Sequence, residues 1–252
     1  ATDIPGNWTG ELVVLAGGFE PPGAPRTAPM PPNEATPVFL SDGYAVAQSG
    51  YSSQGWAVRE ALDDVERLRQ RFIERHGKPR RTYLVGFSMG GGIVVATLER
   101  YPRDYDGALS LCGANVPGTR LAEELFTPLL AFDYFFPGAA GATGLSGPAT
   151  STSDQGAVMA SVAGALAGKP EVAARLARRL QVATDALPGV IGLHHLVFHD
   201  IARRAGGNPV DNRDTVYRGF GDDEAFNAGV KRYAGDSRAM AYVASAPALT
   251  GA

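Results

Sequence analysis

The sequence predicts an α/β protein in which helices cover both faces of a mostly parallel β-sheet, followed by a region built of helices alone. Short apolar runs alternate with longer amphipathic segments between residues 11 and 112, which is typical of parallel strands joined by crossover helices. The alternation stops at Gly113, and residues 115–246 contain no run that predicts a strand. We therefore expect a sheet region over 1–114, a helical cap or lid over 115–246, and a link toward further core strands over 247–252.

Four strands and two long helices are predicted in the sheet region. Residues 57–76 form the clearest helix, because their apolar residues recur every three or four positions. Gly77 and Pro79 end this helix, and the second helix is expected over 90–101. Proline-rich residues 20–37 predict a loop, with a short helix or bridge after it at 38–40. The strands are expected at 11–16, 43–48, 82–86 and 108–112.

The second region reads as a bundle of helices that follows a loop rich in small residues. The loop is expected over residues 137–157, where Gly, Ala, Ser and Thr dominate. An all-helical block after an alternating block is typical of a cap on a sheet domain. Its helices are expected at 157–167, 171–187, 190–205, 223–234 and 236–245.

Composition excludes several classes of protein. The chain has 252 residues and a formal net charge of −3, which argues against a nucleic-acid binder. No stretch approaches the roughly 20 apolar residues that cross a bilayer. The single cysteine, Cys112, excludes an internal disulfide, and we expect it to be a buried structural thiol. Because the sequence opens at Ala1 without a methionine, we expect a secreted or periplasmic bacterial protein after signal-peptide removal.

One sequence motif predicts a catalytic serine. Residues 86–90, Gly-Phe-Ser-Met-Gly, match the pattern G-x-S-x-G, and they stand between a predicted strand and a predicted helix. The turn forces Ser88 into a strained conformation, so its neighbours Gly86 and Gly90 must be small. The hydroxyl then lies at a helix N-terminus, where the positive end of the dipole favours a developing anion. Ser88 is therefore the predicted nucleophile.

A second motif predicts the site that stabilises negative charge during acyl transfer. Such a site needs two preorganised N–H groups aimed at the oxyanion. The first is expected from Met89, directly after the nucleophile. The second is expected from the Gly-Gly-Phe turn after the first predicted strand, with Phe19 as the first choice and Gly18 as the alternative.

These residues resemble the α/β-hydrolase superfamily, in particular the secreted bacterial esterases related to feruloyl esterases and tannases. The likeness covers residues 8–115, and it is weaker over the helical block. Many relatives carry His-Gly where this chain has Gly17-Gly18. The resemblance implies a serine hydrolase that cleaves carboxylic esters through an acyl-enzyme on Ser88, with no metal or organic cofactor. The segments that carry the likeness are 11–19, 43–46, 55–58, 81–92 and 101–108.

The serine also needs a histidine base and an acid, which in this fold follow the nucleophile in the chain. The four histidines are His76, which precedes Ser88 at a helix end, and three on one predicted helix of the cap, His194, His195 and His199. None follows a strand. We therefore expect the last strands of the core, with the acid and the histidine, on a following polypeptide, present as a second chain after cleavage or lost by truncation.

Further residues have alternative roles. Tyr51 and Trp56 follow the second strand and are candidates for the substrate pocket, as is Phe135 in the cap, although each is also a candidate for simple packing. His195 and His199 share a helix face at i, i+4, but without a third ligand no metal site is predicted. One of these cap histidines remains an alternative for the base.

Two alternatives to ester hydrolysis follow from the same residues. Serine peptidases, thioesterases and acyltransferases use the same fold, because they share the nucleophile, the base and the oxyanion donors. The other alternative is a catalytically inactive binding module that keeps the hydrolase frame without its proton relay. The expected partners are a small-molecule or polymeric ester and the second chain.

Overall fold

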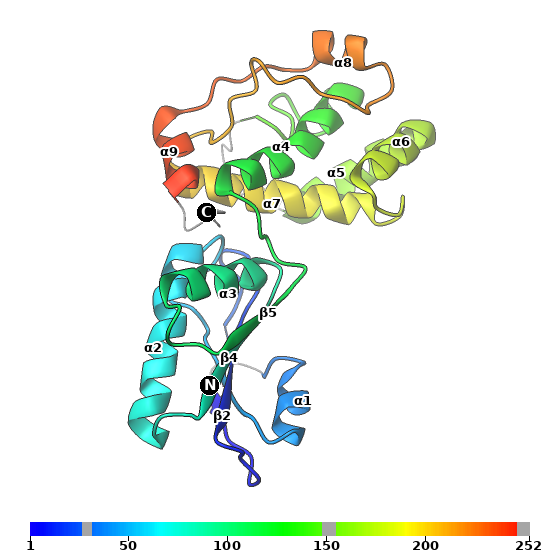
Figure 1. The fold of residues 1–252 in the computed structure, drawn as a ribbon. Helices are drawn as coiled ribbons and strands as arrows, with labels where there is room; N and C mark the ends of the chain where they lie inside the picture. The colour runs from blue at the N-terminus through cyan, green and yellow to red at the C-terminus, as the bar shows by residue number, and fades with distance from the viewer. Residues whose placement is uncertain (27–31, 148–154, 246–252) are drawn as a thin grey trace. The chain divides into compact units, whose positions relative to one another are not determined.

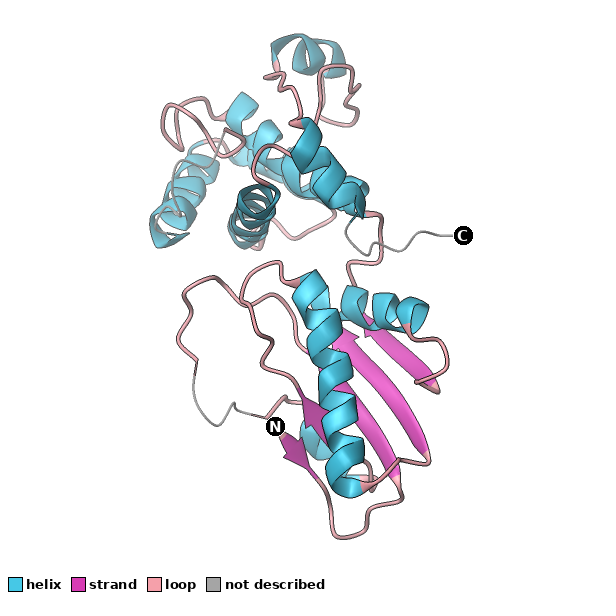
Figure 2. Ribbon diagram, turned by 90° about the vertical axis from the view of Figure 1, so that its left-hand side faces the viewer, coloured by secondary structure: helices cyan, strands magenta, loops and turns pink. Residues whose placement is uncertain are grey.

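The computed structural model describes residues 1–26, 32–147 and 155–245, and it divides into two compact units, Ala1–Pro117 and Gly118–Ser245. The first unit contains the sheet and the second contains helices; each is described by itself (Figures 1 and 2). The link expected at 247–252 lies outside the described residues.

The sheet has five strands in the order β1-β3-β2-β4-β5. Strands β2 (Glu11–Ala16), β3 (Ala45–Gln48), β4 (Arg81–Phe87) and β5 (Gly107–Leu111) are parallel, as predicted, and lie within a residue or two of the expected positions. The two-residue strand β1 (Thr2–Asp3) pairs antiparallel with β3 and was not predicted. So short a strand has too few residues to show a periodic pattern.

Helices cover both faces of this sheet, as Figure 1 shows. On one face, α2 (Val58–His76) and α3 (Met89–Arg100) pack over a core that includes Leu12, Val14 and Leu84. On the other face, α1 (Thr36–Ser41) brings Phe39 and Leu40 against Val13, Leu15, Val46 and Val85. The parallel sheet with helices on both faces, predicted from the sequence, is confirmed.

The connections reverse direction between β2 and β4. After β2 the chain passes over one face through α1, whereas after β4 it passes over the other face through α3. Neighbouring parallel strands whose connections diverge in this way leave a crevice beyond their carboxyl ends. The Gly-Gly-Phe turn after β2 and Ser88 after β4 are therefore at the topological switch point of the sheet.

Strand β5 is one edge of the sheet, and no other strand of the described residues pairs with its free side. On the face that α1 covers only in part, Phe87, Leu109 and Leu111 are 59%, 49% and 44% exposed. The register pairs Phe87 with Leu111, so these side chains form one apolar patch at the edge.

The second unit is all-helical in its described part. The helix α7 (Leu187–Ala205) is central and packs against α4 (Gly118–Phe135), α5 (Gln155–Gly168) and α9 (Ser237–Ser245). The remaining helices are α6 (Pro170–Leu180) and α8 (Asp223–Gly229). The helix pattern expected at 171–187 ends at Leu180, because Gln181 adopts a left-handed conformation with φ 56°. The one expected at 223–234 ends at Gly229.

Helix α4 was not predicted, although it contributes many of the buried side chains of this unit, among them Phe126, Leu129 and Phe132. Its sequence contains Pro128, which removes a backbone donor and normally interrupts a helix. The tertiary packing of the apolar residues on both sides of Pro128 outweighs this local preference.

Candidate active site

Ser88 occupies a sharp turn between strand β4 and helix α3. Its backbone adopts φ 56° and ψ −122°, a conformation that costs a residue with a side chain about 1–3 kcal/mol. Two hydrogen bonds to the segment around β5 hold the turn: the Ser88 N–H donates to Leu111 O at 3.0 Å, and the Ala114 N–H donates to Ser88 O at 3.2 Å. The strain expected from the motif is therefore present at the serine itself.

Glycines surround the turn because there is no room for a Cβ atom. At Gly90 a Cβ would lie 2.7 Å from the carbonyl oxygen of Gly17 and closer still to that of Ala16. At Gly86 it would collide with the backbone of Gly90. This close approach brings the start of α3 against the end of β2, which places Ser88 beside the Gly-Gly-Phe turn.

Backbone N–H groups beside Ser88 are available as donors. An ideal Cβ on Gly18 would be 3.9 Å from the Cβ of Ser88, so the turn lies beside the serine. Among the hydrogen bonds of the described residues, none takes the N–H of Gly18, Phe19 or Met89. The N–H of Met89 also opens helix α3, where the dipole is positive. The arrangement is suited to stabilising an oxyanion on a group attached to Ser88.

The two pocket candidates of the sheet unit follow strand β3. Tyr51 is buried, with φ 44°, and its hydroxyl donates a hydrogen bond to Gly17 O at 3.0 Å. Burial raises the pKa of the Tyr51 hydroxyl, so it stays a donor. Trp56 is half-buried and packs against the core cluster on the α2 face. Tyr51 thus holds the Gly-Gly-Phe turn through the carbonyl oxygen of Gly17, a role that the sequence did not reveal.

Phe135 lies at the end of α4 in the helical unit. It is half-buried, with its ring 4.9 Å from that of Tyr134 and 5.8 Å from that of Phe226, and the Arg175 guanidinium lies 5.9 Å from its centroid. The structure places it in this aromatic cluster, and its contact with substrate stays a prediction.

The histidine base is not provided by the sheet unit. His76 is its only histidine, and it ends α2, five residues before β4 begins. Because Ser88 follows the other end of β4, seven residues of strand at ~3.3 Å each separate the two positions by roughly 20 Å. His76 is therefore excluded as a direct base for Ser88.

The other three histidines lie on α7 in the helical unit. The rings of His195 and His199 are 4.4 Å apart, and His199 Nε2 lies 2.8 Å from the carbonyl oxygen of Leu145. Burial lowers the pKa of all three, that of His195 to about 4. Among the described residues, no group of three or more His, Cys, Asp or Glu side chains is arranged to hold a metal ion.

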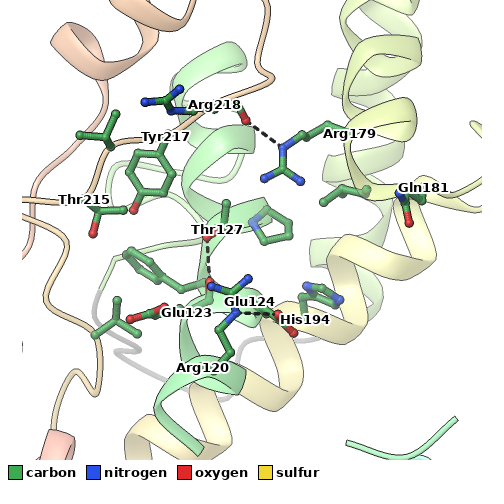
Figure 3. Close-up of a pocket in the computed structure, with 15 residues that line it drawn as sticks. Arg120, Glu123, Glu124, Thr127, Arg179, Gln181, His194, Thr215, Tyr217 and Arg218 are labelled. Carbon is green, nitrogen blue, oxygen red and sulfur yellow. Dashed lines mark hydrogen bonds and ion pairs between the residues drawn. The ribbon is translucent and has the colours of Figure 1, made fainter. Parts of the chain in front are cut away.

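The helical unit contains a cavity of about 620 Å³ between α4, α6, α7 and the segment before α8. Figure 3 shows the Arg120–Glu124 ion pair, 2.8 Å long, and the Arg179 side chain, which donates to the carbonyl oxygen of Arg218 at 2.9 Å. His194 also lines it. The described residues that line this cavity include both acidic and basic side chains, and none of them is a serine, cysteine or lysine.

Two further expectations concern Cys112 and membranes. The thiol of Cys112 was expected to be buried, and this is wrong: the residue is exposed. It directly follows the edge strand β5. None of the described helices combines the length and apolar character that a bilayer crossing requires.

Comparison with known proteins assigns the fold to a family. The sequence model of the α/β-hydrolase family described as serine aminopeptidase, S33, matches residues 43–188, which is more than half of the chain. The chain therefore belongs to this family and to the α/β-hydrolase superfamily, and the predicted superfamily resemblance is confirmed. No curated protein matches the sequence.

Solved structures give weaker likenesses. A structure from the pair of metagenome-derived lipolytic enzymes LipS and LipT shares 20% identity over 51% of each chain, with a TM-score of 0.37. The acetyl esterase MekB shares 14% identity over 83% of this chain and 69% of its own, with a TM-score of 0.38. An acetylester hydrolase from Corynebacterium glutamicum shares 14% identity over 83% of this chain and 68% of its own, with a TM-score of 0.35. The chain thus spans about half the length of the first of these structures.

Proposed function

We propose that the protein is a serine hydrolase that cleaves carboxylic esters at Ser88. The strained backbone of Ser88, between a parallel strand and the first turn of α3, is the observation that carries this proposal. Membership of the α/β-hydrolase superfamily supports it, as does the position of Ser88 at the switch point of the sheet.

In the proposed reaction, Ser88 Oγ attacks the ester carbonyl carbon while a histidine base takes the hydroxyl proton. The carbonyl oxygen becomes an oxyanion that accepts hydrogen bonds from the Met89 N–H and from Gly18 or Phe19. Collapse breaks the bond to the alcohol, which leaves with the proton from the histidine. Water, deprotonated by the same base, then attacks the acyl-enzyme and releases the carboxylic acid and Ser88.

We further propose that the histidine and its acid come from a polypeptide segment that pairs with the free edge of β5. The exposed apolar patch of Phe87, Leu109 and Leu111 supports this, because an unpaired apolar strand edge attracts another strand. The segment is either a second chain or a covalent continuation. The exclusion of His76 also supports it.

The test of the function is ester turnover by the Ser88→Ala variant. With p-nitrophenyl acetate as substrate, we expect turnover to fall to background. Ser41→Ala is the matched control, since Ser41 is an exposed serine at the end of α1. Unchanged turnover in Ser88→Ala would refute the assignment.

A second candidate is an aminopeptidase, because this is the activity in the description of the matched family. Ester and amide hydrolysis share the nucleophile and the oxyanion site, and they differ in the leaving group. Parallel assays with an amino-acid p-nitroanilide and a p-nitrophenyl ester decide between them. Turnover of the anilide at a kcat/KM equal to or above that of the ester would favour the peptidase.

A further inference from the structure

The turn that carries the proposed oxyanion donors is fixed at both ends by the segment after strand β3. At one end, the Tyr51 hydroxyl donates to Gly17 O at 3.0 Å. At the other end, the Gly55 N–H donates to Glu20 O at 2.7 Å. Gly18 and Phe19 lie between these two anchors, and the N–H groups of both have no acceptor among the described residues.

Tyr51 is itself held in place, at a conformation that a residue with a side chain rarely adopts. Its φ of 44° is maintained by hydrogen bonds on both of its backbone polar groups: its N–H donates to Ser49 Oγ at 3.1 Å, and its carbonyl accepts from Arg26 Nη1 at 2.9 Å. The next residue, Ser52, donates its N–H to the carboxylate of Asp64 on α2 at 2.6 Å. The hydroxyl therefore projects from a backbone that is tied to the core helix.

The outer end of the turn has its own polar clamp. The Glu20 carboxylate accepts from Arg26 Nε at 2.9 Å and from Gln54 Nε2 at 3.0 Å. Arg26 thus hydrogen-bonds both the Glu20 carboxylate at the end of the turn and the backbone carbonyl of Tyr51. The clamp holds the Glu20 carboxylate in its charged form, and the hydrogen bond from Arg26 lowers its pKa.

We propose that Tyr51 is a positioning residue for the oxyanion site: by holding the carbonyl of Gly17, its hydroxyl keeps the N–H groups of Gly18 and Phe19 beside Ser88. This inference rests on the proposed hydrolysis at Ser88 and deepens it. The ring of Tyr51 lies beside Gly17, since an ideal Gly17 Cβ would be 3.7 Å from Cε2. The hydroxyl adds the one directional contact, and Tyr51→Phe removes only that contact.

The experiment compares two tyrosine-to-phenylalanine variants of the whole protein. Tyr105 is the matched control, because it is also buried and its hydroxyl donates one hydrogen bond, to Glu66 Oε2 at 3.0 Å. It precedes β5 and so lies toward the amino end of the parallel strands, whereas Ser88 follows the carboxyl end of β4. Both variants lose one hydrogen bond of a buried tyrosine, and Tyr105→Phe should lose at least as much stability as Tyr51→Phe, because its acceptor is a carboxylate.

We expect kcat for p-nitrophenyl acetate to fall ten- to hundredfold in Tyr51→Phe, with KM within twofold of the wild type, because a misplaced donor weakens binding of the transition state alone. Affinity for a boronic acid that forms a tetrahedral adduct should fall by the same factor. The backbone amide of Gly55, which donates to Glu20 O on the same turn, should exchange hydrogen faster. Tyr105→Phe should show none of these three changes.

A purely structural role for Tyr51 predicts the opposite pattern. If Tyr51→Phe keeps the wild-type kcat and boronic-acid affinity at 25 °C while its melting temperature falls, the inference is wrong and the proposed function stands. If Ser88→Ala keeps turnover, the function itself fails. Should Tyr51→Phe not fold, Arg26→Gln removes the clamp at a more exposed position, and we expect a severalfold loss of kcat at unchanged KM. A wild-type kcat in Arg26→Gln would then overturn the inference.

Discussion

Replacing Gly90 by alanine tests the close approach that builds the site. The new Cβ would lie 2.7 Å from Gly17 O, roughly 0.8 Å inside an ordinary contact of ~3.5 Å. Both oxygens that it meets, on Ala16 and Gly17, are backbone atoms at the end of the central strand, so neither can rotate away. Overpacking of this kind costs about 3 kcal/mol or more, and the helix propensity of alanine returns about 1 kcal/mol. The net expected loss is at least about 2 kcal/mol.

The two tryptophans make this loss measurable in one unit. Trp8 and Trp56 are the only tryptophans of the chain, and both belong to the sheet unit. Urea unfolding followed by tryptophan fluorescence therefore reports on the sheet unit, whereas far-ultraviolet circular dichroism reports on both units. The Gly90→Ala variant should shift the fluorescence midpoint to lower urea, and it should lose ester turnover because the Gly-Gly-Phe turn is displaced.

Gly164→Ala is the matched control for the same substitution in a helix. Among the described residues, no atom lies within 4 Å of a Cβ at this position in α5, so the helix propensity alone should stabilise the helical unit by about 1 kcal/mol. The fluorescence midpoint should not move. A Gly90→Ala protein with a wild-type fluorescence midpoint and wild-type turnover would refute the packing that we describe around Ser88.

Three further predictions follow. Leu111→Arg at the edge of β5 should abolish turnover and the co-purification of any second polypeptide, while the free energy of unfolding of the sheet unit, measured without that polypeptide, changes by less than about 0.5 kcal/mol; intact-mass spectrometry, the ester assay and urea unfolding check this. Because the pKa of His195 falls from 6.5 to about 4 on burial, the unfolded chain binds more protons below pH 6.5, and the helical unit should lose about 1 to 3 kcal/mol as the pH falls to 4. Circular dichroism melts should show a weaker pH dependence in His195→Gln, but not in His76→Gln. Asp133→Ala should destabilise the helical unit by about 2–4 kcal/mol, because its buried carboxylate accepts from the N–H groups of Leu145 and Ser146; a shift below 0.5 kcal/mol would contradict this.

The elements nearest to Ser88 could be predicted because their signals are local. The motif at residues 86–90 specifies a strand, a turn and a helix within a few residues, and the small residues in it correspond to contacts that the structure shows. The periodic apolar residues of α2 likewise gave its length within one residue. In each case, short-range pattern and final packing favour the same structure.

Other features depended on contacts between distant segments. Helix α4 was missed because Pro128 disfavours it locally, and only packing against the rest of the helical unit makes it form. The hydrogen bond from Tyr51 to Gly17 joins residues 34 positions apart, and no spacing in the sequence indicates it. The exposure of Cys112 follows from the position of β5 at the edge of the sheet, which strand patterns alone do not give.

The most direct test is reaction of the purified protein, with any polypeptide that accompanies it, with a fluorophosphonate, followed by intact-mass and peptide mass spectrometry. An activated serine hydrolase nucleophile predicts one adduct per chain, on the peptide that contains Ser88, and no adduct in Ser88→Ala. The same spectrum shows whether a second polypeptide is present at a fixed ratio. No adduct on Ser88, or equal labelling of other serines, would contradict the assignment and favour a binding module that keeps only the hydrolase frame.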